Sequence, residues 1–183
     1  MFDTAERYGA KGSSLVFNSL NSIGASYVKS LGISTTASYQ FGGDVETNLA
    51  NWAVGANIAT KFTPKPDRRT ASSVVDSCRE SAARLGVDKI ALYQIHMPDV
   101  IQPFAKLGLE DNKDTIFWDG LAECYLSGLA SNVGVSNYGP TMVQRAQEHL
   151  AKRGVPLASN QICFSLLNQR QGNLATVEAC KVS

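Results

Sequence analysis

Along this chain of 183 residues, short apolar runs are separated by longer stretches that mix apolar and polar positions. Short apolar runs predict strands at 54–60, 89–95, 131–135 and 157–164. Longer stretches between Gly, Pro or cap residues predict helices at 70–86, 116–127 and 140–153. The first of these helices carries an apolar stripe at Val74, Cys78, Ala82 and Leu85. Thr70 is suited to cap its start and Gly86 its end.

The predicted elements follow one another as strand, helix, strand, helix, strand, helix, strand. This alternation predicts parallel βα units. The run at 89–95 is continuous rather than alternating, as expected for a strand that is buried on both faces. In the barrel form of this architecture, functional groups lie at the carboxyl ends of the strands. An open doubly wound sheet is the alternative, although no GxGxxG phosphate loop supports it.

Polar residues stand where the predicted strands end. They are Asp3, Lys61, His96, Ser136, Asn137 and Gln161. Each has an ordinary structural explanation when taken alone: Lys61 can extend its ammonium to solvent, and His96 can be a satisfied core histidine. Packing does not explain why one end of every strand collects such residues, so we expect a functional rim there. His149, in a polar stretch, is expected to be a surface residue without a function.

Composition and charge exclude several classes of protein. The net charge is +1, with 17 basic and 16 acidic residues, so no strong field attracts nucleic acid or anionic lipid. No apolar run approaches the roughly 20 residues of a membrane span, and the acidic start is unlike a signal peptide. The four cysteines are widely spaced without a CxxC pair, which argues against a metal site. We expect reduced thiols in a reducing compartment, and no nucleic-acid or membrane partner.

Residues 10–42 differ from the rest of the chain. They are rich in Ser, Gly and Thr and show no period of 3.6 or 2. Structureless loops longer than about 12 to 15 residues are uncommon in compact domains. This stretch can be a surface excursion or translated non-coding sequence.

The residues of the predicted rim suit the reduction of a carbonyl group. That reaction needs a hydride donor, a proton donor for the developing alkoxide and polar groups that fix the oxygen. Tyr8 can donate the proton if a nearby ammonium such as Lys61 lowers its pKa from the usual value of about 10. Asp3 can hold that ammonium in place, and His96 can orient the carbonyl oxygen.

Five motifs, in this order, resemble the aldo-keto reductase family: DTAERYG, ATKF, LYQIHMPD, VGVSNYGP and SNQICFSLLN. The resemblance covers residues 2–168, apart from residues 10–42. Members of the family usually pass directly from the DTAxxYG motif to a short helix that resembles residues 43–52, so the resemblance implies an insertion at 10–42. It implies that Tyr8 is the general acid, that Asp3 and Lys61 tune its acidity, and that His96 orients the substrate. The activity that it implies is the NADPH-dependent reduction of an aldehyde or ketone to an alcohol.

The resemblance also implies how the cofactor is held. In this family NADPH lies extended over the mouth of the barrel. Ser136, Asn137 and Gln161 would hold its nicotinamide carboxamide. These side chains supply the donors and acceptors that an amide needs. The protein would position the cofactor, and the cofactor would carry the redox chemistry.

The fold implied by the resemblance is a partial (β/α)8 TIM barrel with strands one, seven and eight missing, because a complete barrel needs about 250 residues. One incomplete domain then spans residues 1–183. The chain would be a fragment of a longer protein or an incomplete gene product, and such a fragment can be inactive. Its motifs are most similar to bacterial and plant-plastid members, so the predicted location is the cytoplasm or a plastid.

Two other functions remain open. One is a non-catalytic binding or regulatory subunit, since some proteins that resemble this family bind NADPH as partners of channels. The complete set of four catalytic residues favours the enzyme, because a binding role needs no proton donor. The other is an aldolase that uses Lys61 to form a Schiff base. That mechanism requires a lysine without a paired carboxylate, and Asp3 argues against it.

Overall fold

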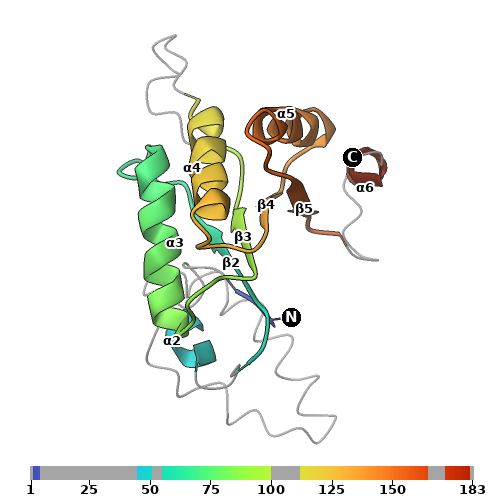
Figure 1. Cartoon of the computed structure of the whole chain (residues 1–183). Coiled ribbons are helices and arrows are strands. Elements are labelled where there is room, and N and C mark those ends of the chain that lie inside the picture. The colour runs from blue at the N-terminus through green and yellow to red at the C-terminus, as the bar shows by residue number, and fades with distance from the viewer. Residues whose placement is uncertain (1, 5–44, 51–54, 100–111, 165–171, 182–183) are drawn as a thin grey trace, which may run out of the picture.

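The computed structural model describes residues 2–4, 45–50, 55–99, 112–164 and 172–181 (Figure 1). Within these ranges the elements are β1 (Phe2–Asp3), α2 (Val45–Ala50), β2 (Ile58–Phe62), α3 (Ala71–Leu85), β3 (Leu92–Ile95), α4 (Asp114–Leu126), β4 (Val133–Ser136), α5 (Pro140–Ala151), β5 (Leu157–Gln161) and α6 (Asn173–Lys181). The predicted alternation of strands and helices is confirmed. Tyr8 and the predicted insertion at 10–42 lie outside the described residues.

The five strands form one parallel sheet in the order β1-β2-β3-β4-β5, which is also their order along the chain. Successive helices pack on each other: α2 on α3, α3 on α4, α4 on α5 and α5 on α6. Figure 1 shows α3, α4 and α5 along one side of the sheet. A doubly wound sheet would reverse its strand order and carry helices on both faces. The structure therefore consists of consecutive βα units of a barrel, and the doubly wound alternative is wrong.

One hydrogen bond shows that the sheet is curved. Gln161 Nε2, on β5, donates to Asp3 Oδ2, on β1, over 3.0 Å. Neighbouring strands are about 4.8 Å apart, so the edges of a flat five-stranded sheet would be separated by roughly 19 Å. Two short side chains cannot bridge that distance. The two edges therefore turn towards each other, as in the wall of a barrel.

The strands begin and end where their neighbours offer hydrogen-bonding partners. β2 starts at Ile58 rather than at the predicted 54, and it continues through Lys61 to Phe62. Its last residue pairs with Ile95 of β3. β5 likewise ends at Gln161, rather than at the predicted 164, where its pairing with β4 ends. Strand pairing, and not the extent of the apolar run, sets these boundaries.

Alternate residues of a strand face either the helices or the inner side of the sheet. On β2, Phe62 lies in the core under the helices, with its ring centroid 5.4 Å from that of Phe117 on α4. The preceding Lys61 points to the inner side. On β3, Tyr93 belongs to the same core, whereas Gln94 faces inward and donates to Ser159 of β5. The inner side is therefore polar close to the carboxyl ends of the strands.

Local signals define α3, as the sequence predicts. Thr70 and Ser73 form a reciprocal capping box at its start. Gly86 ends the helix in the left-handed conformation, with φ 65°. The predicted stripe is buried in full: Val74, Cys78, Ala82 and Leu85. Both ends of this helix and its buried face thus follow from residues within the segment itself.

His149, predicted to lie at the surface, is half-buried and contacts the neighbouring helix. Its Nε2 lies 2.9 Å from Asp119 Oδ1, and its ring centroid lies 5.5 Å from that of Trp118. Arg153 donates to the same carboxylate oxygen over 3.0 Å. These contacts fasten α5 to α4 and leave the His149 side chain 27% exposed. The sequence did not indicate the contact with Asp119, because that residue stands 30 positions away along the chain.

All four cysteines are free thiols, as predicted. Cys78 and Cys124 are buried in the core that α3 and α4 share. A hydrogen bond with Cys78, together with burial, raises the pKa of Cys124. This thiol therefore stays protonated at physiological pH and behaves as a small apolar group.

Gly134 on β4 tests the packing of the inner side. A Cβ there would lie 2.3 Å from Ser159 Oγ and 2.8 Å from the Ser159 backbone oxygen. We expect Gly134→Ala to lower the free energy of unfolding by about 2 to 3 kcal/mol, because the adjacent strand must move.

Gly139→Ala is the matched control, because a Cβ at that position meets nothing within 4 Å. Gly139 is the N-cap of α5, so we expect a loss of about 1 kcal/mol or less. Urea denaturation measures both variants. Equal losses would contradict the close approach of β5 to Gly134.

Candidate active site

Lys61 is the buried charge at the centre of the site. Its side chain is 1% exposed, and Nζ lies 2.6 Å from Asp3 Oδ1. Nζ also donates to the backbone oxygen of Thr4 over 2.9 Å. An ammonium without water needs a counter-charge and hydrogen-bond acceptors to offset its lost hydration, and both are present. Lys61 is therefore fixed inside the sheet and does not extend to solvent.

Asp3 connects Lys61 to Gln161. One carboxylate oxygen accepts from Lys61 Nζ, and the other accepts from Gln161 Nε2 over 3.0 Å. A carboxylate attracts an amide N–H and repels an amide oxygen, so this contact turns Oε1 of Gln161 away from Asp3. One carboxylate thus sets the position of the lysine and the orientation of the glutamine.

His96 follows β3 at the same edge of the sheet. Its backbone N–H donates to the Phe62 carbonyl over 2.8 Å, and its ring Nδ1 lies 3.3 Å from Thr63 Oγ1. On the other side, its carbonyl accepts from Asn137 Nδ2 over 2.9 Å. His96 is half-buried and tied to the residues that follow both neighbouring strands, so it is not a core histidine.

Asn137 stands in a strained turn directly after β4. Its φ of 61° places it in the left-handed region, which costs an L-residue about 1 kcal/mol and is tolerated best by Asn and Asp. The backbone N–H donates to the Gln161 carbonyl over 2.8 Å, and the side-chain N–H group donates to Ser136 Oγ over 3.1 Å. This backbone conformation therefore brings Asn137 against β5, Ser136 and His96 at once.

The structure brings six of the predicted site residues to one edge of the sheet: Asp3, Lys61, His96, Ser136, Asn137 and Gln161. The seventh, Tyr8, lies outside the described residues. Among the residues that the structure describes, no group of three or more His, Cys, Asp or Glu side chains is arranged to hold a metal ion. The donors of this rim are amide, hydroxyl, ammonium and imidazole groups, which suit an organic ligand.

A buried polar network beside this rim was not expected from the sequence. The Tyr138 hydroxyl donates to Asp114 Oδ1 over 2.6 Å, and the same oxygen accepts the backbone N–H of Asp99 over 3.2 Å. The Asp99 carboxylate accepts two N–H groups of Arg69, over 3.1 and 2.8 Å. Asp99 and Tyr138 belong to the motifs LYQIHMPD and VGVSNYGP, which was the available signal, although neither motif indicates that they meet.

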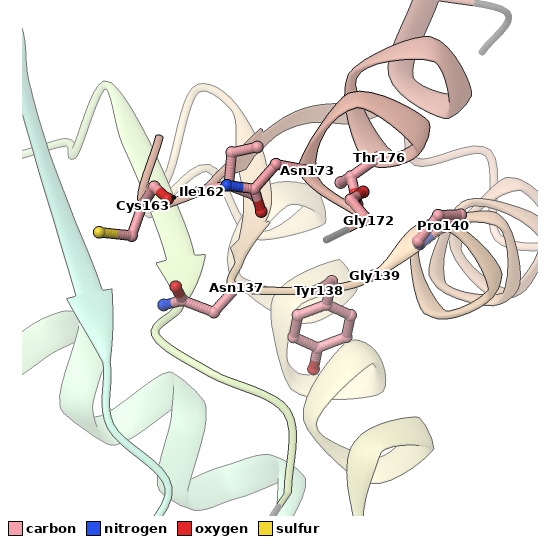
Figure 2. A pocket seen from close by; sticks show the side chains of 9 residues that line it. All are labelled: Asn137, Tyr138, Gly139, Pro140, Ile162, Cys163, Gly172, Asn173 and Thr176. Carbon is pink, nitrogen blue, oxygen red and sulfur yellow. Dashed lines mark hydrogen bonds between the residues drawn. The ribbon is translucent and has the colours of Figure 1, made fainter. Parts of the chain in front are cut away.

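A pocket of about 280 Å³ adjoins Asn137. Figure 2 shows it between the turn after β4, the residues that follow β5 and the start of α6. The lining residues are Asn137, Tyr138, Gly139, Pro140, Ile162, Cys163, Gly172, Asn173 and Thr176. The side chains of Asn137 and Tyr138 extend in different directions from the turn (Figure 2). The turn thus presents one residue to the rim and the next to the buried network.

Parallel strands in chain order, helices on the outer side and a polar rim at the carboxyl ends define a protein of the (β/α) barrel class. The chain belongs to the aldo/keto reductase family, whose sequence model matches residues 1–181.

Two curated relatives illustrate the similarity. The chain is 38% identical over 123 residues to the chloroplastic pyridoxal reductase of Arabidopsis thaliana, a match that covers 67% of this chain and 32% of that protein. It is 30% identical over 151 residues to aldo-keto reductase AKR2E4 of Bombyx mori, which covers 77% of this chain and 43% of the relative.

Solved structures agree with the fold. The crystal structure of Bombyx mori AKR2E4 in complex with NADP superposes with a TM-score of 0.59 at 24% identity, covering 75% of this chain and 45% of that one. The structure of AKR2E5 complexed with NADPH gives a TM-score of 0.57 at 25% identity, covering 75% and 42%. The chain therefore spans between 32% and 45% of the length of these relatives.

The buried ion pair predicts an asymmetry between its two partners. Asp3→Asn leaves the buried ammonium of Lys61 without its counter-charge, and we expect the free energy of unfolding to fall by about 2 to 3 kcal/mol. The Asp3 side chain is 39% exposed. Lys61→Met therefore leaves a carboxylate that water can solvate, and we expect a loss of about 1 kcal/mol.

Comparison with the double variant tests this asymmetry. Asp3→Asn/Lys61→Met should be more stable than Asp3→Asn alone, because the second change removes the unpaired charge. Urea denaturation at neutral pH measures all three variants. Equal stability of the single Asp3→Asn and the double variant would show that the ammonium does not depend on Asp3.

Proposed function

We propose that this chain carries the catalytic rim of an enzyme that reduces an aldehyde or ketone to an alcohol with NADPH. The observation that carries the proposal is the buried Lys61 ammonium, held 2.6 Å from Asp3 at the carboxyl edge of a parallel sheet. Burying a charge there is costly, and packing would be served as well by an apolar residue. Buried ionisable pairs at strand ends are therefore candidates for a chemical role.

The catalytic roles follow from the chemistry of a carbonyl that becomes an alkoxide. Tyr8 is the proposed proton donor, and the Lys61 ammonium is the proposed positive charge that favours its ionised phenol and makes it a stronger acid. Asp3 holds the Lys61 ammonium in place through an ion pair of 2.6 Å. His96, held through its ring by Thr63, orients the carbonyl oxygen. NADPH, when bound, supplies the hydride.

The polar groups of the rim match a nicotinamide carboxamide in donors and acceptors. The N–H groups of Asn137 and Gln161 are directed to the His96 carbonyl and the Asp3 carboxylate, which turns both amide oxygens the other way. A carboxamide nitrogen carries two N–H groups, one for each of these oxygens. The Ser136 hydroxyl accepts from Asn137 Nδ2 and can donate its own proton to the carboxamide oxygen. This complementarity supports Ser136, Asn137 and Gln161 as cofactor residues.

The alternatives fit the rim less well. A Schiff-base aldolase needs a lysine without a paired carboxylate, whereas Lys61 Nζ lies 2.6 Å from Asp3 Oδ1. A subunit that only binds NADPH has no need of a buried lysine paired with a carboxylate. A non-catalytic binding or regulatory subunit is therefore the second candidate function. An assay for carbonyl reduction distinguishes it from the enzyme, because only the enzyme turns over substrate.

The substrate class that we propose is a small carbonyl compound. The relative from Arabidopsis thaliana is named as a pyridoxal reductase, and pyridoxal is an aldehyde. The proposed location is the cytoplasm or a plastid, and that relative's description as chloroplastic supports the plastid. None of the helices in the described part of the chain has the length and apolarity that a bilayer span requires.

Tyr8→Phe tests the proton donor. We expect the rate of carbonyl reduction, followed by loss of NADPH absorbance, to fall by a factor of roughly 100 or more, since general acid catalysis typically contributes that much. The dissociation constant of NADPH should stay within about twofold, because the phenol has no part in holding the carboxamide. Tyr125→Phe, on the half-buried side of α4, is the control and should keep full activity. Loss of NADPH binding in Tyr8→Phe, or full turnover, would contradict the assignment.

Asn137→Gly tests the cofactor contact without straining the backbone, because glycine adopts a φ of 61° freely. Removing the amide oxygen should weaken NADPH binding by roughly 3- to 10-fold, the value of one hydrogen bond. The reduced 3-acetylpyridine analogue of NADPH lacks the carboxamide N–H groups, so its affinity should change by less than about twofold. Equal losses for both cofactors would mean that Asn137 does not contact the carboxamide.

A further inference from the structure

The buried network beside the rim joins residues from separate loops, and none of its members has a part in the chemistry proposed above. Arg69 precedes α3, Asp99 follows His96, Asp114 opens α4, and Tyr138 follows Asn137. These four residues therefore link the loops that leave β2, β3 and β4. The same three strands carry Lys61, His96 and Ser136–Asn137 at their ends.

The network is well buried. Asp99, Asp114 and Tyr138 are each at most 3% exposed. Asp99 binds Arg69 through two hydrogen bonds and also accepts the backbone N–H of Lys113 over 2.8 Å. The bidentate arrangement fixes both partners in angle as well as in distance. Replacing such groups by apolar residues would often cost little stability, so their presence favours a specific geometry over mere stability.

Tyr138 is the link that reaches the strained turn. Its hydroxyl donates to Asp114 Oδ1 over 2.6 Å, and its backbone carbonyl accepts from Asn160 Nδ2 over 2.9 Å. Tyr138 is thus held at both ends, directly after the left-handed Asn137. Burial and the charge of Asp114 raise the pKa of the Tyr138 hydroxyl, so it stays a donor at physiological pH.

The left-handed conformation of Asn137 persists only if the residues that contact the turn keep their positions. Without an anchor, the backbone would relax to an unstrained φ and withdraw the side chain from the His96 carbonyl. Figure 2 shows the Tyr138 ring extending from this turn towards α4, away from the Asn137 side chain. The ring is fixed there by Trp118, whose centroid lies 6.3 Å away.

We propose that Tyr138 is a positioning residue, which acts through Asp114, Asp99 and Arg69 to hold the Ser136–Asn137 turn in register with His96. The network serves as a clamp on three loops of the rim. Its consequence for cofactor binding rests on the proposed function, because the clamp would set the angle at which the Asn137 amide meets the carboxamide. The clamp itself is a property of the ligand-free chain.

The test compares two buried tyrosines in the ligand-free chain. Tyr138→Phe removes the hydroxyl of the clamp, and Tyr93→Phe removes a hydroxyl that lies 3.5 Å from the Val74 carbonyl, in the core under the helices. Amide hydrogen exchange reports the Asn137 N–H, which bonds the Gln161 carbonyl, and the Asp99 N–H, which bonds Asp114. We expect Tyr138→Phe to speed exchange at both amides by roughly tenfold relative to the α3 and α4 core, and Tyr93→Phe to leave that ratio unchanged.

Two results would overturn the clamp. One is exchange at Asn137 that is the same in both variants. The other is acceleration that spreads evenly over the core, which would make Tyr138 an ordinary stabilising residue. If Tyr138→Phe does not fold, Asp114→Asn replaces it, since an amide oxygen still accepts from the phenol without the charge. That variant should give an acceleration at Asn137 and Asp99 of roughly threefold, and none would again overturn the proposal.

Cofactor binding gives a second readout that a purely structural role would not move. Tyr138→Phe should weaken NADPH by roughly 3- to 10-fold and leave the 3-acetylpyridine analogue within about twofold. Tyr93→Phe should bind both as the unmodified chain does. If the unmodified chain does not bind NADPH at all, the proposed function fails. The exchange experiment then still decides whether the clamp exists.

Discussion

The structure depends on the burial of one positive charge. Lys61 is almost fully removed from water on the inner side of β2, and it is stable there because Asp3 supplies a carboxylate and Thr4 a backbone oxygen. This requirement ties β1 to β2 more firmly than two residues of ladder pairing would. Asp3 then reaches across the sheet to Gln161 on β5, so the same carboxylate links both edges. The carboxylate that pairs with the buried charge of Lys61 therefore also bonds the two edges of the curved sheet to each other.

The arrangement explains why the functional groups gather where they do. Parallel strands in chain order end at one edge, so a polar residue at each strand end joins a common rim. Asn137 then adds a contact that pairing alone does not provide, because its left-handed turn directs one amide towards the His96 carbonyl. The amide N–H groups of Asn137 and Gln161 bond to other residues of the rim, so their amide oxygens remain as acceptors for a ligand. The N–H groups of a carboxamide are complementary to that pattern, whereas a phosphate, which offers mainly acceptors, is not.

The sequence predicts what depends on neighbouring residues and misses what depends on distant ones. The N-cap at Thr70 and the stripe from Val74 to Leu85 were visible because both depend on residues within one segment. The rim residues were visible because each follows an apolar run, and the motif order identified the family. The bond from Gln161 to Asp3 joins positions 158 apart, and no local pattern predicts it. The clamp of Tyr138 on Asp114 and the contact of His149 with Asp119 were missed for the same reason.

The central claim is that one rim, at the carboxyl ends of β1 to β5, binds NADPH through its carboxamide. The most direct test is an NMR titration of the ¹⁵N-labelled chain with NADPH, which reads backbone and side-chain amides together. The account predicts saturable shifts centred on Asn137 and Gln161, including their side-chain amides, with His96 next in size. Saturable shifts centred on the outer helices would contradict the proposed site, and the absence of any saturable shift would contradict cofactor binding by this chain.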